Sequence, residues 1–333
     1  PYCLKSFKLI KTTNTYSLIK CSCDVFPLID NKILYLKKNL IKKKLLAKIT
    51  NDELFLHLFA FSKRSSFLFR LKIINKLLKK LTTYQLIKIL TWLGYNKNYS
   101  KYILERERLP SFYISLILSK LINKNLPIID FGCGFGHYLK KLNKKELKIG
   151  IDKDFLSLYF NSNFSDKNSC FICFDFDGYN LPFKKNSINQ FIFIDGLYSI
   201  KNHFAFFSNL KKILLKPYNG FITQILNINA KTFKTYHLCS PNNLKIILKK
   251  LRFNGFNIIS SAKILVSLID NKKEIIFDKK DINNPKVYNI IFTNKKIIKV
   301  DKKILKLFKK IGINYYQDND LLDDLKKYKK NFL

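Results

Sequence analysis

The feature that most constrains the fold of this chain is the segment at positions 127–139, PIIDFGCGFGHYL. A short apolar run ends in Asp130 and is followed by Gly132, Gly134 and Gly136 at alternate positions. Glycine adopts positive φ and allows close approach to the backbone, so the pattern predicts a strand, a tight loop and a helix start that can cradle an anionic or nucleotide group. Three occupants are open at this point: a dinucleotide phosphate, S-adenosylmethionine, or none beyond a tight turn.

The rest of the chain after position 126 alternates between strand-like and helix-like segments, which is typical of a doubly wound α/β domain. We expect helices at 137–143, 155–160, 204–215 and 241–251. The expected strands cover 126–131, 147–152, 169–174, 190–194, 220–227, 257–266 and 287–294.

A second acid stands where a nucleotide fold places a carboxylate. The segment KIGID ends in Asp152, 22 positions after Asp130, and an acid at that distance accepts hydrogen bonds from ribose hydroxyls. The alternative is that Asp152 caps the following helix, although Asp154 is the better cap candidate. The glycine spacing also differs from the G-x-G-x-x-G of dinucleotide sites.

Asp130 and the three glycines form the pattern D-x-G-x-G-x-G, which resembles the loop of class I S-adenosylmethionine-dependent methyltransferases. The later segments FDFDGYNLPF, NLKKILLKPYNGFITQ and VYNIIFTNKK resemble further family segments in the same order, so the resemblance covers roughly residues 100–295. It is nearest to the small-molecule and quinone-type branch. The chain departs from the family at Ile188 and Asn189, and at a turn stretched by one residue at Tyr218 and Asn219.

The resemblance implies a Rossmann-like sheet of seven strands, doubly wound, with the last strand antiparallel. It also implies that residues 130–136 hold the amino-acid end of S-adenosylmethionine, Asp152 the ribose, and Asp177 the adenine amino group, with Asp175 as the runner-up. The cofactor-binding residues expected in this way are Asp130, Gly132, Cys133, Gly134, Gly136, Asp152, Lys153, Asp177, Gly178 and Asp195.

Residues at the carboxyl ends of the strands are candidates for handling the acceptor, because ligands gather at that edge of open α/β sheets. Asp195 and Tyr198 are the catalytic candidates, with a turn acid and a packing aromatic as the respective alternatives. His203 and His137 fit helix surfaces better. Methyl transfer from a sulfonium needs alignment above all, and a base only where the acceptor is protonated.

The net charge of +39 admits two interpretations. It suits an anionic partner such as RNA. It also suits an AT-rich genome, since only five of the 62 basic residues are arginine. We expect a small-molecule acceptor, with rRNA or tRNA as the second choice. A noncatalytic methyltransferase-like protein of an assembly is the third reading.

Four segments are expected: a small β-like piece at 1–40, a helical region at 41–122, the methyltransferase domain at 123–295 and a basic helical tail at 296–333. The first segment resembles a degenerate zinc ribbon, but Cys21-x-Cys23 offers two ligands at the wrong spacing, so we expect no metal.

The cysteines are seven in number and scattered, which predicts a reducing compartment, either cytoplasmic or inside an organelle, and not secretion. Cys170 and Cys173 lie on an expected buried strand, where core packing is the favoured reading. No apolar run approaches a membrane span and no signal peptide is evident.

Overall fold

The computed structural model of the chain describes most of the residues after position 94 and short stretches before it. Asp177 and Gly178, predicted near the adenine, lie outside the described residues, as do Cys21, Cys23 and residues 37–81. The described stretches are 8–12, 16–20, 25–29, 32–36, 82–92, 95–142, 146–175, 181–230, 237–277, 281–311 and 319–332.

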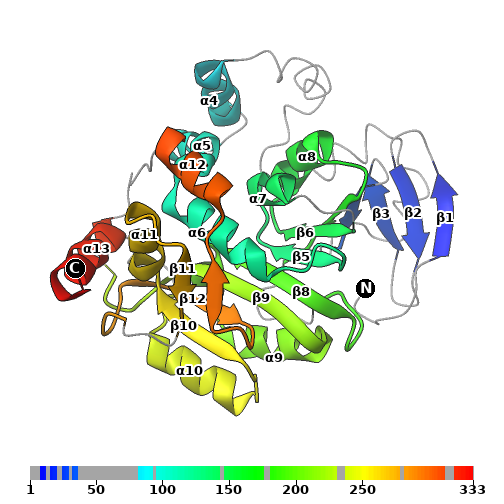
Figure 1. The fold of residues 1–333 in the computed structure, drawn as a ribbon. Coiled ribbons are helices and arrows are strands. Elements are labelled where there is room, and N and C mark those ends of the chain that lie inside the picture. The colour runs from blue at the N-terminus through cyan, green and yellow to red at the C-terminus, as the bar shows by residue number, and fades with distance from the viewer. Residues whose placement is uncertain are drawn as a thin grey trace. The chain divides into compact units, whose positions relative to one another are not determined.

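Strands and helices alternate through the second half of the chain (Figure 1). The strands are β1 (Lys8–Thr12), β2 (Tyr16–Lys20), β3 (Val25–Ile29), β4 (Ile33–Tyr35), β5 (Ile128–Phe131), β6 (Lys148–Asp152), β7 (Ser169–Cys173), β8 (Ile188–Ile194), β9 (Leu214–Leu226), β10 (Phe256–Ser260), β11 (Glu274–Ile276), β12 (Val287–Phe292) and β13 (Ile297–Lys299).

The α-helices and 3-10 helices connect these strands. They are α4 (Thr83–Trp92), α5 (Lys97–Leu104), η3 (Arg106–Arg108), α6 (Pro110–Leu118), η4 (Ser119–Leu121), α7 (His137–Lys141), α8 (Phe155–Phe164), η5 (Leu197–Ser199), α9 (His203–Ile213), α10 (Pro241–Lys250), α11 (Ser261–Ile269), α12 (Lys302–Ile311) and α13 (Asn319–Phe332). None of the helices in the described stretches is long and apolar enough to cross a membrane.

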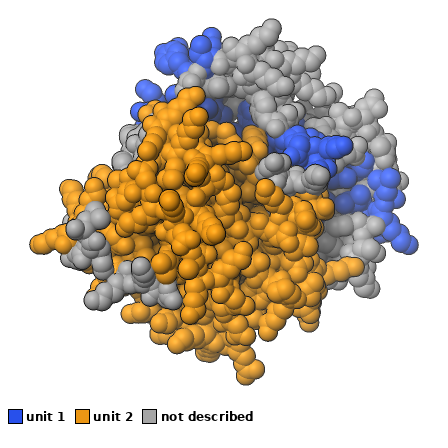
Figure 2. All heavy atoms as spheres, in the orientation of Figure 1, with its two compact units in different colours: residues 1–106, 134–137, 150–175 blue, residues 107–133, 138–149, 176–333 orange. Residues whose placement is uncertain are grey.

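The chain divides into two compact units, coloured separately in Figure 2. Unit 1 consists of Pro1–Arg106, Gly134–His137 and Gly150–Asp175, and unit 2 holds the remaining residues. The boundary falls inside β6, so this strand contributes residues to both units. The domain limits expected after residues 40, 122 and 295 remain predictions.

In unit 1 the hydrogen-bonded strand order is β1-β2-β3-β4-β7-β6. Strands β1 to β4 form an antiparallel meander, and β4 pairs with β7 in parallel, with Ile33 opposite Phe171. Strands β3 and β4 form a hairpin within the piece expected to be β-like. Helix α8 packs against β4 and β7, where the Tyr35 and Phe155 rings meet edge to face at 5.7 Å. Aromatic burial therefore holds the meander to the nucleotide-fold strands.

In unit 2 the strand order is β6-β5-β8-β9-β12-β10. Strands β5, β8 and β9 are parallel, and β12 is antiparallel to both β9 and β10. The seven strands expected from the sequence are β5 to β10 and β12. If they are numbered 1 to 7 in chain order, and β7 is counted next to the shared strand β6, the strand order is 3-2-1-4-5-7-6. Its first five positions are those of the doubly wound nucleotide-binding sheet. The predicted fold class is confirmed, including the antiparallel last strand.

Helices cover both faces of the unit 2 sheet. Helices α9 and α10 lie on one side of it, and α6 and α11 lie on the other (Figure 1). The core on the α9 side is aromatic, because the ring of Phe206 packs against Phe131 at 5.9 Å and Phe193 at 5.5 Å, and all three rings are buried. Fixing β5 and β8 to one helix in this way positions the loops that leave their carboxyl ends.

The strand expected at 257–266 is wrong in its second half, because the chain turns into α11 after Ser260. The Ser260 hydroxyl accepts from the backbone N–H of Lys263 at 3.1 Å, which caps the helix, and Asp281 accepts from the Ser260 N–H at 2.7 Å. The residues from Ser261 to Leu268 are all buried. A helix buried on every side has no polar face, so its sequence resembles a buried strand.

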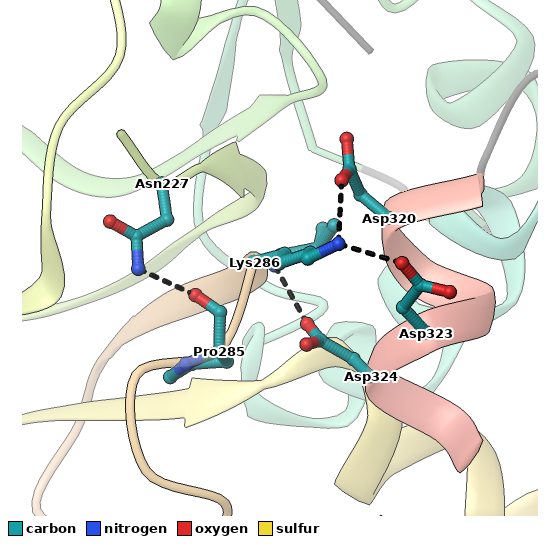
Figure 3. Close-up of polar contacts among 7 residues, drawn as sticks. Asn227, Pro285, Lys286, Asp320, Asp323 and Asp324 are labelled. Atoms are coloured by element: carbon teal, nitrogen blue, oxygen red, sulfur yellow. Dashed lines mark hydrogen bonds and ion pairs between the residues drawn. The ribbon is translucent and has the colours of Figure 1, made fainter. Parts of the chain in front are cut away.

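The C-terminal helix α13 is fastened to the start of β12 by three acids around one lysine (Figure 3). The Lys286 ammonium lies 2.7 Å from Asp323 Oδ2 and 3.4 Å from Asp320 Oδ1. The backbone N–H of Val287 donates to Asp324 Oδ2 at 2.9 Å. Burial raises the pKa of Asp324 to about 6, against these hydrogen bonds. The helical tail expected from the sequence is thus tied to the sheet by polar contacts.

Candidate functional site

The glycine loop leaves the end of β5 with left-handed backbone at all three glycines: φ is 64° at Gly132, 49° at Gly134 and 67° at Gly136. A side chain at Gly136 would collide with Asn161, since an ideal Cβ would lie 2.0 Å from its amide nitrogen. A Cβ at Gly134 would meet nothing within 4 Å. The loop is therefore packed at its end and open in its middle, where a ligand can approach the backbone.

Asp152, the last residue of β6, binds this loop directly. Its Oδ2 accepts from the backbone N–H of Gly134 at 2.8 Å, and its Oδ1 accepts from the N–H of Asp154 at 2.8 Å. A carboxylate has about four lone-pair directions, so each oxygen keeps capacity for one more donor. Burial raises the pKa of Asp152 to about 6, while the two backbone N–H groups lower it. The residue as a whole is half-buried, and its oxygens keep the capacity to accept from a ligand hydroxyl.

Asp154 connects the start of α8 to Tyr95, which stands two residues before α5. Its Oδ2 accepts from the Tyr95 hydroxyl at 2.7 Å and from the Ser157 hydroxyl at 2.8 Å. The buried Tyr95 ring also meets the ring of Phe135 at 5.8 Å, and Phe135 meets Phe160 at 5.8 Å. Asp154 stands directly before α8, where a helix cap was expected. Tyr95 was not foreseen, because no local pattern relates it to residues 59 positions away.

Asn161 is a second site residue that the sequence did not reveal. It lies on α8 with only 1% of its surface exposed, and its amide nitrogen faces the Gly134 carbonyl at 3.5 Å. Its Oδ1 is buried and has no hydrogen-bond partner among the described residues. A buried acceptor without a partner is costly, so its place beside an open glycine loop fits a ligand that donates a hydrogen bond.

Residues of unit 2 form the first part of the same loop. Asp130 is 2% exposed at the carboxyl end of β5, so it supports the loop from the interior. Cys133 is partly exposed, as is Gly132. A Cβ at Gly132 would lie 3.1 Å from the Phe193 ring, which leaves little room for any other residue.

The loop after β8 carries the two catalytic candidates. Asp195 has φ of 52°, unusual for a residue with a side chain, and its N–H donates to the Thr223 carbonyl at 3.1 Å. Tyr198 lies on η5, and its carbonyl accepts from the N–H of His237 at 3.0 Å. Both side chains are partly exposed. The left-handed backbone at Asp195 is of a kind that clusters at ligand-binding loops. The catalytic roles of Asp195 and Tyr198 remain predictions.

His203 fits the expected helix-surface position, whereas the Nε2 atom of His137 is buried. One ring nitrogen of His203, Nε2, lies 3.3 Å from the Leu197 carbonyl at the start of α9, where Asn202 caps the helix by accepting from the Ala205 N–H. His137 is the first residue of the short helix α7. Neither position calls for a proton-transfer role.

The remaining candidates are placed as follows. Lys153 is exposed beside Asp152, and Asp175 is exposed after β7. Cys173 is buried on β7, and burial raises the pKa of the neighbouring Cys170 thiol to about 11, as expected for strand residues that pack in the core. The described stretches hold no group of three or more residues that could bind a metal ion.

Comparisons with known proteins return solved structures and no sequence relative. No protein-family model matches the chain, and no curated protein matches it. The solved structures similar to it include an S-adenosylmethionine-dependent methyltransferase from Aquifex aeolicus, at 14% identity and a TM-score of 0.42, covering 62% of this chain and 100% of that one.

Two further solved structures have the same TM-score as the first. A Thermotoga maritima S-adenosylmethionine-dependent methyltransferase has 14% identity and a TM-score of 0.42, covering 60% of this chain and 95% of that one. Phosphoethanolamine N-methyltransferase 2 of Haemonchus contortus, in complex with S-adenosylmethionine, has 17% identity and a TM-score of 0.42, covering 57% and 52%.

The fold is assigned from features of this chain alone: its strand order, the loop of Gly132, Gly134 and Gly136, and Asp152 at the end of β6. It is Rossmann-like. The antiparallel β12 agrees with the sheet that the sequence motifs imply.

Proposed function

We propose that the chain binds S-adenosylmethionine and transfers its methyl group to a small-molecule acceptor. The observation that carries the proposal is the pairing of Gly134 with Asp152 at 2.8 Å, beside a position where no atom fills the space of a side chain. A loop of this kind approaches the ligand with backbone groups, and the acid next to it offers oxygens to ribose hydroxyls.

Residues of the loop would hold the amino-acid end of the ligand, Asp152 the ribose and Asp177 the adenine. When bound, S-adenosylmethionine supplies a methyl group on a sulfonium that is already a good leaving group. The protein's work is to align the acceptor and to exclude water. Asp195 and Tyr198 are the residues proposed to orient the acceptor, with proton removal needed only where the acceptor is protonated at neutral pH.

The departures from the family pattern do not argue for a noncatalytic protein. The Asn189 amide donates to the carbonyls of Leu215 and Pro217, at 3.3 and 3.4 Å. Asn189 thus holds the first residues of β9, and the turn expected at Tyr218 and Asn219 is wrong, because both residues lie within this strand. These contacts lie at the amino end of β8, whereas the donor loop follows the carboxyl end of the parallel strand β5, so neither departure weakens the case for the donor loop.

The choice of a small-molecule acceptor is supported by the branch that the motifs resemble. RNA is the second candidate, on the strength of the +39 charge. The scattered cysteines support a reducing compartment, cytoplasmic or organellar, as the place of action.

Calorimetric titration of the full chain with S-adenosylmethionine and S-adenosylhomocysteine tests donor binding. We expect both to bind the wild type, and Asp152→Asn to weaken binding at pH 7 by about tenfold or more, the cost of a charge-assisted hydrogen bond. Asp323→Asn removes the same charge from an exposed position on α13 and should bind like the wild type. No heat with either ligand would refute the proposal.

Incubation of the wild type with methyl-labelled S-adenosylmethionine and fractionated cell extract then tests the acceptor. Label in the low-molecular-mass fraction supports a small molecule. Label in RNA or protein would overturn that part of the proposal, and donor binding without label in any fraction would favour a noncatalytic protein.

A further inference from the structure

Two adjoining grooves lie in unit 2, where β9 begins and β12 ends. The first, here called the amide groove, has a volume of about 620 Å³. The second, the lysine groove, has a volume of about 340 Å³ and follows β13 and η4. Lys295 lines both grooves, so they adjoin at this residue.

The amide groove combines an aromatic wall with hydrogen-bonding side chains. Its lining includes Lys216, Tyr218, Asn219, Asn254, Asn294 and Lys295. Amide side chains donate and accept at once, and bases present the same mixture of donors and acceptors at their edges. This lining therefore suits a polar planar ligand better than an apolar one.

The aromatic wall is held in place before any ligand arrives. The Tyr218 ring meets Phe253 edge to face at 6.2 Å, and the Lys211 ammonium lies 3.3 Å from the Tyr218 hydroxyl. Lys211 also donates to the Arg252 carbonyl at 3.0 Å. Elsewhere in the lining, a Cβ at Gly255 would lie 2.0 Å from the Asn294 amide oxygen, so only glycine allows that approach. A preformed wall reduces the ordering cost of binding.

The charge of the lysine groove is positive and mostly uncompensated. Lys120 pairs with Asp301 at 2.5 Å. Within the described stretches, no ion pair involves Lys216, Lys295 or Lys299. The neutral amides and the three uncompensated ammonium groups leave the joined grooves with an excess of positive charge, which attracts a chain of phosphates.

Helix α12 continues this positive surface directly after Asp301. Its buried side is fixed by Ile304 and by the Phe308 ring, which meets Tyr113 at 5.3 Å. The exposed lysines of the helix are Lys302, Lys303, Lys306, Lys309 and Lys310. The positive region therefore extends over a full helix beyond the grooves.

We propose that the two grooves form a docking surface for single-stranded nucleic acid. Lys216, Lys295 and Lys299 contact successive phosphates, one base stacks on Tyr218, and the amide side chains contact base edges. The hollowed, amide-lined form of the surface favours this ligand over the flat face of a bilayer.

The surface lies at the edge of the sheet opposite the glycine loop. Strands β5, β8 and β9 are parallel, the loop follows the carboxyl end of β5, and the amide groove lies at the amino end of β9. Nucleic acid bound there is a docking partner and not the group that is methylated. The inference is thus independent of the proposed small-molecule acceptor.

Fluorescence anisotropy with fluorescein-labelled 12-nucleotide oligo(U) and oligo(dT), on the full chain between 50 and 200 mM NaCl, tests the proposal. Three phosphate contacts at about 0.7 each predict a slope near −2 for log affinity against log salt, or about twentyfold over this range. Oligo(U) binding alone would assign the surface to RNA, and equal binding of both oligonucleotides to single strands in general. Either result supports the proposal.

Matched pairs of Lys→Glu variants distinguish binding at the two grooves from attraction by the net positive charge of the protein. Lys216→Glu with Lys295→Glu should weaken binding at least tenfold at 100 mM salt. Lys326→Glu with Lys330→Glu makes the same charge change on the exposed side of α13 and should stay within about twofold of the wild type.

Variants of Tyr218 test the stacking contact. Tyr218→Ala should weaken binding by about 5- to 150-fold, the range for one stacked base. Tyr218→Phe keeps the ring and should lose little.

Three results would overturn the proposal. These are no binding at 50 mM salt, equal loss in the two double variants, and binding of phosphatidylserine vesicles with no binding of either oligonucleotide. Calorimetric binding of S-adenosylhomocysteine by each variant verifies that it is folded. That control also separates failure of this surface from failure of the donor site.

Discussion

The pH dependence of donor binding is the sharpest test of the role assigned to Asp152. Its pKa is raised to about 6 in the free protein, chiefly by burial. Ribose hydroxyls that donate to the carboxylate favour its ionised form, so binding lowers this pKa. If only the ionised form binds, the competent fraction falls from about nine-tenths at pH 7 to about one-tenth at pH 5. The apparent dissociation constant then rises about tenfold, or about 1.4 kcal/mol.

Calorimetry with S-adenosylhomocysteine at pH 5, 6, 7 and 8 measures this effect. Repeating the pH 6 titration in buffers of different ionisation enthalpy counts the protons released. We expect about half a proton at pH 6, since half of the Asp152 carboxyls are protonated there, and almost none at pH 8. Asp324 also titrates near pH 6, so Asp324→Asn serves as the control and should keep the full pH effect. Constant affinity from pH 5 to 8 without proton release would refute the role of Asp152.

Three further predictions concern the loop, its support and the C-terminal helix. Gly134→Ala should cost only about 1–2 kcal/mol of stability, the penalty for positive φ, yet abolish calorimetric donor binding. In Gly136→Ala the added Cβ also collides with Asn161, so this variant should unfold at clearly lower urea concentration. Equal stability of the two variants would contradict the packing described. Tyr95→Phe should lose about 1 kcal/mol in thermal denaturation with donor affinity nearly unchanged, while Tyr95→Ala, which also removes the ring from Phe135, should weaken donor binding at least fivefold. Because the folded-state pKa of Asp324 lies above its unfolded value, ionisation of this carboxyl costs stability as the pH rises from 4 through 6. Relative to the wild type, Asp324→Asn should therefore gain about 1–3 kcal/mol of unfolding free energy between pH 4 and pH 7 in urea denaturation. A difference between the two proteins that does not change with pH would show that the carboxyl is not shielded.

The sequence alone determined the class of fold and the centre of the site. The alternation of strand and helix patterns predicted the order of elements, and β5 to β8 were found where expected, while β9 begins at Leu214 and not at 220. The glycines at 132, 134 and 136 predicted a loop of left-handed backbone, and all three have positive φ. These features are local: backbone conformation and side-chain periodicity depend on neighbouring residues, so they can be read from the chain in order.

The tertiary structure decided what depends on residues far apart in the sequence. The segment at 261–269 became a helix because Ser260 is held by Asp281 and because every face of α11 is buried. Tyr95 and Asn161 joined the site through packing against a loop to which no sequence pattern connects them. The grooves that share Lys295 arise from the start of β9, the segment before β10, the segment after β12, β13 and η4. Burial and long-range contact are properties of the assembled fold, since a side chain acquires its partners only when distant elements pack together.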